Sequence, residues 1–256
     1  MGKEPPLASL SLTHVHYVSS SAASQHPVQT RNEKLIKGPY RLQNPEDHLS
    51  HLSAWLALVP QALCVVYVTL VWATREVEVG LMFAGQLACE ALNFALKRII
   101  KEERPKEMFG KGYGMPSSHA QFVAFFAVYM GLFLLFRHSP NAQSQGIIFR
   151  IIATFGISLG ATAVAASRIY LTYHTLRQVL AGSAVGVVFA LAWFIFTGFL
   201  RSYGWIDWGL DHSVARCFRL RDLVVSEDLA EAGWQRWEAK HKVKRSENGG
   251  RTSKLD

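Results

Sequence analysis

The chain has 256 residues and a formal net charge of +8 at pH 7; half of its residues are hydrophobic and 18% are charged. Three scattered cysteines are too few for a disulfide scaffold, and this composition also excludes collagen and a wholly disordered chain. The positive charge alone leaves nucleic acid, anionic lipid and phosphorylated substrates open as partners.

The distribution of polar residues predicts three regions. Residues 1–52 form a polar N-terminal region in which residues 19–45, rich in Ser, Gln, Pro and Asn, are expected to be a disordered insertion. Residues 53–200 form a membrane-embedded domain. Residues 201–256 form a polar, basic C-terminal tail.

Five apolar runs fill the middle region, each close to the length of about twenty residues that crosses a bilayer. They are hydrophobic around their whole circumference, whereas the helices of a soluble bundle keep a polar face. The runs cover residues 54–73, 79–96, 120–136, 147–166 and 179–200. The predicted fold class is therefore all-α: a polytopic membrane helical bundle with about five transmembrane helices.

The few charged residues beside these runs gather in two links. The first link carries Lys97, Arg98, Lys101, Arg104, Lys106 and Lys111; the second carries Arg168, His174 and Arg177; His119 begins the third run. Because successive spans alternate in direction, both links lie at the same face of the membrane. Such a cluster suits an anion-binding catalytic site. Topology signals are the alternative, and they explain the Lys and Arg residues but not the histidines.

Two local patterns in and after the first link favour phosphate. Lys97 and Arg104 are seven residues apart, which predicts that they share one face of a helix continuing until Pro105. The stretch Pro116-Ser117-Ser118-His119 opens the third span. Its hydroxyls and unbonded backbone N–H groups then lie at a helix N-terminus, where phosphate binds well.

The third pattern is Ser167-Arg168, followed by His174 and Gln178, which are four residues apart and can touch across one helical turn. In order and spacing, the three patterns resemble the type 2 phosphatidic acid phosphatase superfamily. Its signature is Lys, six residues, Arg-Pro; then Pro-Ser-Gly-His; then Ser-Arg, five residues, His, three residues, Asp. The resemblance covers about 150 residues, from the first span to the fifth.

The resemblance implies that Nε2 of His174 attacks phosphorus to form a phosphohistidine and that His119 protonates the leaving oxygen. The phosphate oxygens would be held by Lys97, Arg104, Ser117, Ser118 and Arg168. It implies neither a metal ion nor another cofactor, because fixed cations stabilise the charge that magnesium stabilises elsewhere.

Two positions depart from the superfamily signature: Ser118 replaces Gly, and Gln178 replaces Asp. The amide of Gln178 would orient His174 and fix its tautomer, but with less electrostatic support than a carboxylate gives. Glu90, two turns before Lys97, is a nearby carboxylate; a structural polar contact is the interpretation that we favour for it. Both departures resemble the branch of the superfamily that acts on dolichyl diphosphate.

The resemblance thus implies hydrolysis of dolichyl diphosphate to dolichyl phosphate and phosphate, in the endoplasmic-reticulum membrane and with a luminal site. The expected partners are this polyprenyl lipid and the membrane, and no nucleic acid. Two alternatives remain: a broader phosphatase for phosphatidate or sphingoid phosphates, and a non-catalytic lipid-binding membrane protein. Charge counting does not settle sidedness, because the cations at the site have a catalytic role.

The C-terminal tail contains eleven Lys or Arg residues after position 200. The stretch Ser226-Glu227-Asp228 is typical of a helix start. A surface-lying amphipathic helix with a basic end or a solvated tail would follow it, and the solvated tail is the more common outcome.

Overall fold

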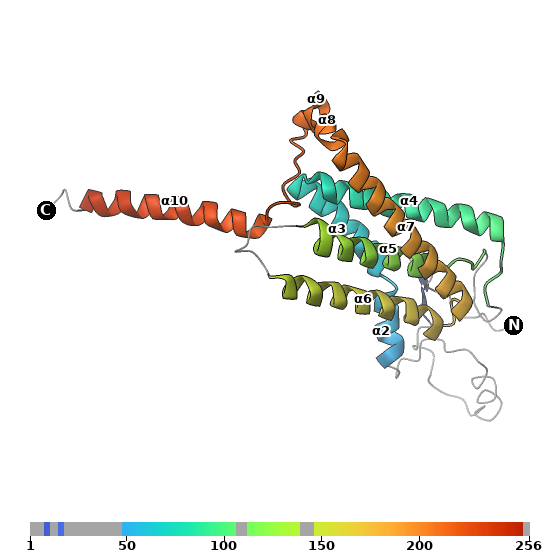
Figure 1. Ribbon diagram of the computed structural model, residues 1–256. Helices are drawn as coiled ribbons and strands as arrows, with labels where there is room; N and C mark the ends of the chain where they lie inside the picture. The colour runs from blue at the N-terminus through green and yellow to red at the C-terminus, as the bar shows by residue number, and fades with distance from the viewer. Residues whose placement is uncertain (1–7, 11–14, 18–47, 106–111, 139–145, 253–256) are drawn as a thin grey trace, which may run out of the picture.

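The computed structural model describes residues 8–10, 15–17, 48–105, 112–138 and 146–252, and these are almost entirely helical (Figure 1). The membrane bundle consists of α2 (His48–Leu56), α3 (Val59–Thr74), α4 (Val77–Ile100), α5 (Ser118–Leu132), the π-helical turn η1 (Phe133–Arg137), α6 (Ile147–Tyr170) and α7 (Leu176–Ser202). The C-terminal helices are α8 (Trp205–Asp211), α9 (Ser213–Cys217) and α10 (Leu229–Thr252). The predicted insertion at 19–45, and Lys106 and Lys111, lie outside the described residues.

Within the described residues, five helical segments are long and apolar enough to cross a membrane, which confirms the predicted bundle. The first segment combines α2 and α3, and the third combines α5 with η1. The first span begins earlier than predicted, at His48, and it is interrupted at Ala57 and Leu58. Pro60 follows at the start of α3, where its missing N–H group removes one helical hydrogen bond across the break.

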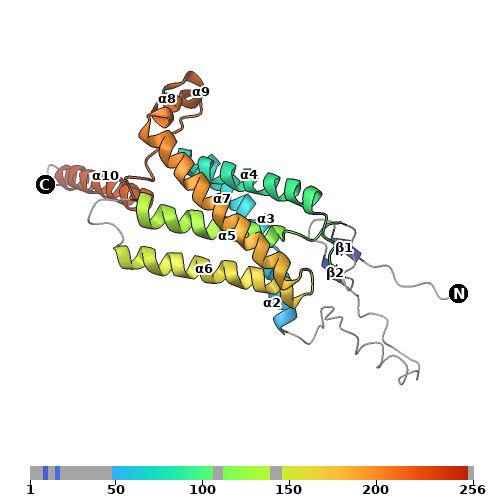
Figure 2. The ribbon, with the colours of Figure 1, turned by 45° about the vertical axis from the view of Figure 1, so that its right-hand side comes forward.

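Helix α5 lies at the centre of the bundle, packed against α4, α6 and α7 (Figures 1 and 2). In its most apolar stretch 50% of the residues are buried, against 6% for α6, so α6 faces lipid. Phe125 and Tyr129 of α5 are fully buried. At Gly186 of α7 an added Cβ would lie 2.4 Å from the carbonyl oxygen of Gln121, which shows how closely the two helices approach.

A buried network of ion pairs joins the helices at the end where α4 begins. Glu78, whose side chain is 4% exposed, accepts hydrogen bonds from Arg137 at 2.6 Å and from Arg201 at 2.7 Å. Tyr129 donates to the same carboxylate at 3.0 Å, and Arg201 also pairs with Asp222. Losing one partner of such a network leaves a buried charge uncompensated. The network therefore fixes the start of α4 and the ends of η1 and α7 relative to one another.

Both ends of the chain add structure outside the spans. The predicted helix start at residues 226–228 is confirmed: Oδ1 of Asp228 accepts hydrogen bonds from the N–H groups of Ala230 and Glu231, at 2.9 and 3.3 Å. Helix α10 extends away from the bundle and is largely exposed, so this part of the tail is helical (Figure 1). The strands β1 (Ala8–Leu10) and β2 (Val15–Tyr17) pair antiparallel, a small departure from the all-α prediction (Figure 2).

Candidate active site

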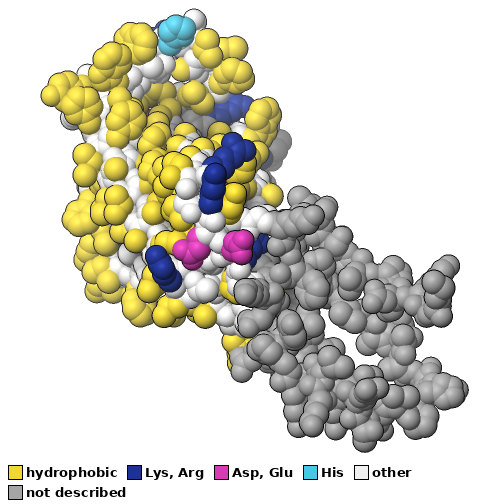
Figure 3. Space-filling model, turned by 90° about the vertical axis from the view of Figure 1, so that its right-hand side faces the viewer, with side chains coloured by type: hydrophobic (Ala, Val, Ile, Leu, Met, Phe, Trp, Pro, Cys, Tyr) yellow, Lys and Arg dark blue, Asp and Glu magenta, His cyan; other side chains and the backbone are white. Residues whose placement is uncertain are grey.

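The three motifs meet at one end of the bundle, as the alternation of the spans predicts. Lys97 lies in the last turn of α4, Ser117 precedes α5, Arg168 lies in the last turn of α6, and His174 precedes α7. Figure 3 looks onto this end and shows acidic and basic side chains together, with hydrophobic side chains along the flank. Two links that are far apart in sequence thus form one charged site at the end of apolar helices.

The chain reaches Arg104 by a different path from the predicted one. Helix α4 ends before Lys101, which adopts a left-handed φ of 52° and donates its N–H to the carbonyl oxygen of Lys97. The prediction that Lys97 and Arg104 share one face of a continuing helix is therefore wrong. Arg104 lies instead in the non-helical segment at residues 101–105, which we call the return segment. It is held by Gly114, whose N–H donates to the carbonyl oxygen of Glu102 at 2.7 Å.

Ser117 and Ser118 lie at the N-terminus of α5, as predicted. The first N–H groups of a helix have no partner within it, so this turn presents donors to an anion. Ser117 is fully buried, and within the described residues its Oγ has no hydrogen-bond partner. A buried hydroxyl without a partner costs about 1–3 kcal/mol. A bound phosphate oxygen would supply the missing partner.

Backbone contacts join this turn to the third motif. The N–H of Ser117 donates to the carbonyl oxygen of Gln178 at 3.1 Å. One turn further along α7, an added Cβ on Gly182 would lie only 2.5 Å from the carbonyl oxygen of Ser117. The sequence patterns did not single out Gly182, although its place four residues after Gln178 could have suggested a close approach. The start of α5 and the start of α7 are thus in direct backbone contact.

Arg168 offers buried hydrogen-bond donors to the site. Arg168 is 4% exposed, and its guanidinium carbon lies 4.3 Å from the centre of the Tyr173 ring, a cation–π contact. In the part of the chain that the structure describes, its Nε and Nη1 have no hydrogen-bond partner. A guanidinium held by stacking, with unused donors, is suited to bind phosphate oxygens.

His174 is buried directly before α7, and its Nδ1 lies 3.2 Å from Oε1 of Gln178. A carbonyl oxygen can only accept, so Nδ1 carries the proton and the lone pair is on Nε2. The pKa of His174 is lowered to about 4, chiefly by burial; the hydrogen bond to Gln178 acts in the opposite direction, and the charges of Arg168, Arg104 and Lys97 add to the lowering. The imidazole is therefore neutral near pH 7 and available as a nucleophile.

The predicted contact between His174 and Gln178 is confirmed, but it arises from a helix cap and not from a helical turn. Helix α7 begins after Thr175, whose Oγ1 accepts the N–H of Gln178 at 3.3 Å. In return, Oε1 of Gln178 accepts the N–H of Thr175 at 3.3 Å. This reciprocal capping box holds the Gln178 side chain back toward the nucleophile.

The amide nitrogen of Gln178 points to the first motif. It donates to Oε1 of Glu102 at 3.1 Å and to the carbonyl oxygen of Glu103 at 2.9 Å. The carboxylate that contacts Gln178 is therefore Glu102. The sequence patterns missed Glu102, although an acidic pair inside a motif that is otherwise cationic was a signal for it.

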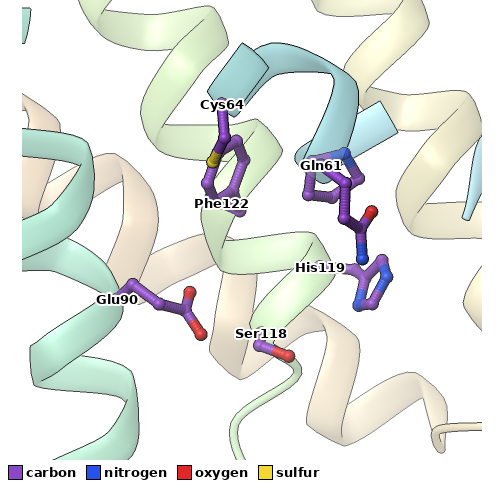
Figure 4. A pocket seen from close by; sticks show the side chains of 7 residues that line it. Gln61, Cys64, Glu90, Ser118, His119 and Phe122 are labelled. Carbon is purple, nitrogen blue, oxygen red and sulfur yellow. The ribbon is translucent and has the colours of Figure 1, made fainter. Parts of the chain in front are cut away.

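His119 begins α5, and its Nε2 donates to the carbonyl oxygen of Ala57 at 3.1 Å. This contact uses the break between α2 and α3 and leaves Nδ1 for the site. Glu90 of α4, with Ser118 and His119, lines a cavity of about 220 Å³ to which α3 contributes Gln61 and Cys64 (Figure 4). The carboxylate of Glu90 thus faces this cavity, and the structural polar contact that we favour for it stays a prediction.

Known proteins are similar to this chain over the part that carries the site. The PAP2 superfamily matches residues 77–202, from the start of α4 to the end of α7. A Neurospora crassa protein that carries the provisional name dolichyldiphosphatase is 46% identical over 94% of this chain and 95% of its own length. Dolichyldiphosphatase of Saccharomyces cerevisiae is 32% identical over 86% of this chain and 95% of its own. Human dolichyldiphosphatase 1 is 42% identical over 61% of this chain and 68% of its own. No solved structure matches the chain.

Proposed function

The chain belongs to the PAP2 superfamily and, within it, to the dolichyldiphosphatases, and from this premise we propose that it hydrolyses dolichyl diphosphate to dolichyl phosphate and phosphate. The observation that carries the proposal is the state of His174. Its imidazole is neutral, its Nδ1 proton is held by Gln178, and its nucleophilic Nε2 belongs to a site with three cationic side chains.

In the first step, Nε2 of His174 attacks the terminal phosphorus of the diphosphate. The new bond from nitrogen to phosphorus forms as the bond from phosphorus to the bridging oxygen breaks. His119 gives its proton to that oxygen, and dolichyl phosphate leaves. Because Nε2 of His119 keeps the proton that it donates to Ala57, the acid form of His119 is the imidazolium, whose Nδ1 proton passes to the leaving oxygen and leaves a neutral ring.

Charge on the transferred phosphoryl group is stabilised by fixed donors. Arg168 has two buried donor atoms without a partner in the described residues, and the buried hydroxyl of Ser117 also has no partner there. Lys97 and Arg104 add positive charge, and the first N–H groups of α5 point to the same end of the bundle. These groups are in place before substrate binds, which is what electrostatic stabilisation of a transition state requires.

In the second step, water hydrolyses the phosphohistidine. His119, which lost its proton in the first step, accepts a proton from the water as its oxygen bonds to phosphorus. The bond between phosphorus and Nε2 of His174 breaks, phosphate is released, and both histidines return to their initial states. The same residues thus serve both steps, and the residues in the cycle supply the nucleophile, acid, base and charge.

A substrate profile of the purified protein in detergent tests this assignment. Dolichyl diphosphate should be hydrolysed faster than dolichyl phosphate or phosphatidate, and EDTA should leave the rate unchanged. A tenfold preference for phosphatidate would overturn the assignment. His174→Ala should abolish phosphate release while the protein stays in the membrane, and turnover at the wild-type rate would exclude the mechanism.

The proposed location is the endoplasmic-reticulum membrane, with the site in the lumen and the C-terminal tail in the cytoplasm. Five spans place the two ends of the bundle on opposite sides of a membrane. A glycosylation acceptor inserted into the link at 106–111 tests the sidedness. Glycosylation of that acceptor is expected, and glycosylation of one placed after α10 instead would reverse the assignment.

A further inference from the structure

The side chain of Gln178 connects the nucleophile to a carboxylate. On one side its Oε1 faces two N–H groups, the Nδ1–H of His174 and the backbone of Thr175. On the other side its Nε2 donates to two oxygens, the Glu102 carboxylate and the Glu103 carbonyl. All four contacts agree on one orientation of the amide. The carbonyl end therefore belongs to His174 and the amino end to Glu102.

We propose that Glu102 is a positioning residue for the reaction, acting on His174 through Gln178. The inference rests on the proposed role of His174 as nucleophile. In the superfamily signature a carboxylate stands four residues after the nucleophile; here an amide stands there, and the negative charge lies one side chain further out. The hydrogen bond at 3.1 Å polarises the amide, so its Oε1 becomes a stronger acceptor for the Nδ1 proton.

The charge balance of the reaction explains why a carboxylate near His174 would help. When Nε2 forms its bond to phosphorus, the ring keeps its Nδ1 proton and becomes a cation. Lys97, Arg104 and Arg168 all act on His174 with positive charge, which opposes that cation. In the part of the chain that the structure describes, a chain of hydrogen bonds through Gln178 joins the carboxylate of Glu102 to the nucleophile.

A purely structural role for Glu102 is separable from this one. Its backbone carbonyl accepts the N–H of Gly114 at 2.7 Å, and this contact does not depend on the side chain. Glu102→Gln removes the charge while keeping the size of the side chain and an oxygen that can still accept from Gln178. Glu103→Gln is the matched control, because Glu103 is exposed and contacts Gln178 through its backbone.

The experiment uses the full chain in detergent with dolichyl diphosphate as substrate. Glu102→Gln should lower kcat by about tenfold, the smaller end of the loss when a metal-binding histidine loses its outer hydrogen-bond partner, which is a comparable arrangement, with KM unchanged within twofold. Orthovanadate, which mimics the five-coordinate transition state, should bind more weakly by the same factor, while inorganic phosphate binds as before. Glu102→Asp keeps the charge and should retain more activity than Glu102→Gln, and Glu103→Gln should match the wild type.

Several results would overturn the proposal. An unchanged kcat in Glu102→Gln would do so, as would equal losses in Glu102→Gln and Glu103→Gln. Parallel losses of phosphate and vanadate binding, or a Glu102→Asp variant as impaired as Glu102→Gln, would indicate a structural role instead. An inactive His174→Ala with an unaffected Glu102→Gln would remove only this inference. An active His174→Ala would exclude the proposed mechanism, and a tenfold preference for phosphatidate would overturn the proposed function itself.

Discussion

Replacing Gly182 by Ala should separate the phosphate-binding turn from the nucleophile. The new Cβ would lie 2.5 Å from the carbonyl oxygen of Ser117 and 3.1 Å from its nitrogen, whereas ordinary contacts begin at 3.4 Å. Both neighbouring atoms are backbone, so the starts of α5 and α7 must part by about 0.9 Å, the difference between 3.4 and 2.5 Å. A displacement of about 1 Å costs about 100-fold in rate when it affects positioned catalytic groups. The overpacking should also destabilise the fold by about 1–3 kcal/mol.

Steady-state rates with dolichyl diphosphate, together with thermal unfolding in detergent, test this prediction. Gly156→Ala on α6 is the matched control, because an added Cβ there has nothing within 4 Å. We expect kcat to fall about 100-fold in Gly182→Ala and to stay at the wild-type value in Gly156→Ala. A Gly182→Ala protein that keeps kcat within threefold of the wild type would refute the claim that this contact sets the site geometry.

Three further predictions concern charge. Arg168→Lys should lower kcat/KM by about 10- to 100-fold, because an ammonium loses both the stacking on Tyr173 and the paired donors; a loss below threefold in the same rate assay would contradict this. His174 is protonated below pH about 6.5 when unfolded but only below about 4 when folded, so its contribution to stability is present above pH 6.5 and is lost as the pH falls toward 4. Between pH 7 and 4.5 the wild type should lose about 2–3 kcal/mol more unfolding free energy than His174→Asn, measured by denaturation at each pH; equal losses would show that the imidazole is not held neutral. Glu78→Gln should destabilise the fold by about 3–5 kcal/mol, because Arg137 and Arg201 lose their buried partner, while kcat per folded molecule stays unchanged; a selective loss of kcat would contradict the structural role of this network.

The sequence predicted the membrane bundle and the gathering of the three motifs for physical reasons that are local. Twenty-residue apolar runs can be read directly, and the alternation of spans places Lys97 and His174 at one face whatever the packing. The contact between His174 and Gln178 also followed from spacing, although a capping box makes it. The types of the residues and their short-range spacing were sufficient to predict these features.

The sequence could not predict the features that depend on contacts between distant segments. Helix α4 ends at the left-handed residue Lys101, and Gly114 bonds to the segment that follows; no propensity at Lys101 marks either feature. Glu102 meets Gln178 across 76 positions, and Gly182 meets the Ser117 backbone from another helix. Such partners are chosen by tertiary packing, so spacing rules for single helices do not find them.

Trapping the covalent intermediate is the most direct test of whether His174 forms a phosphohistidine. The full chain is mixed with dolichyl diphosphate that carries radioactive phosphorus in its terminal phosphate, quenched in alkali within the first turnover, and digested. We expect an acid-labile label on the peptide that contains His174, and no label in His174→Ala. A label on another residue, or turnover without any trapped label in a protein whose His174→Ala variant remains active, would contradict this expectation.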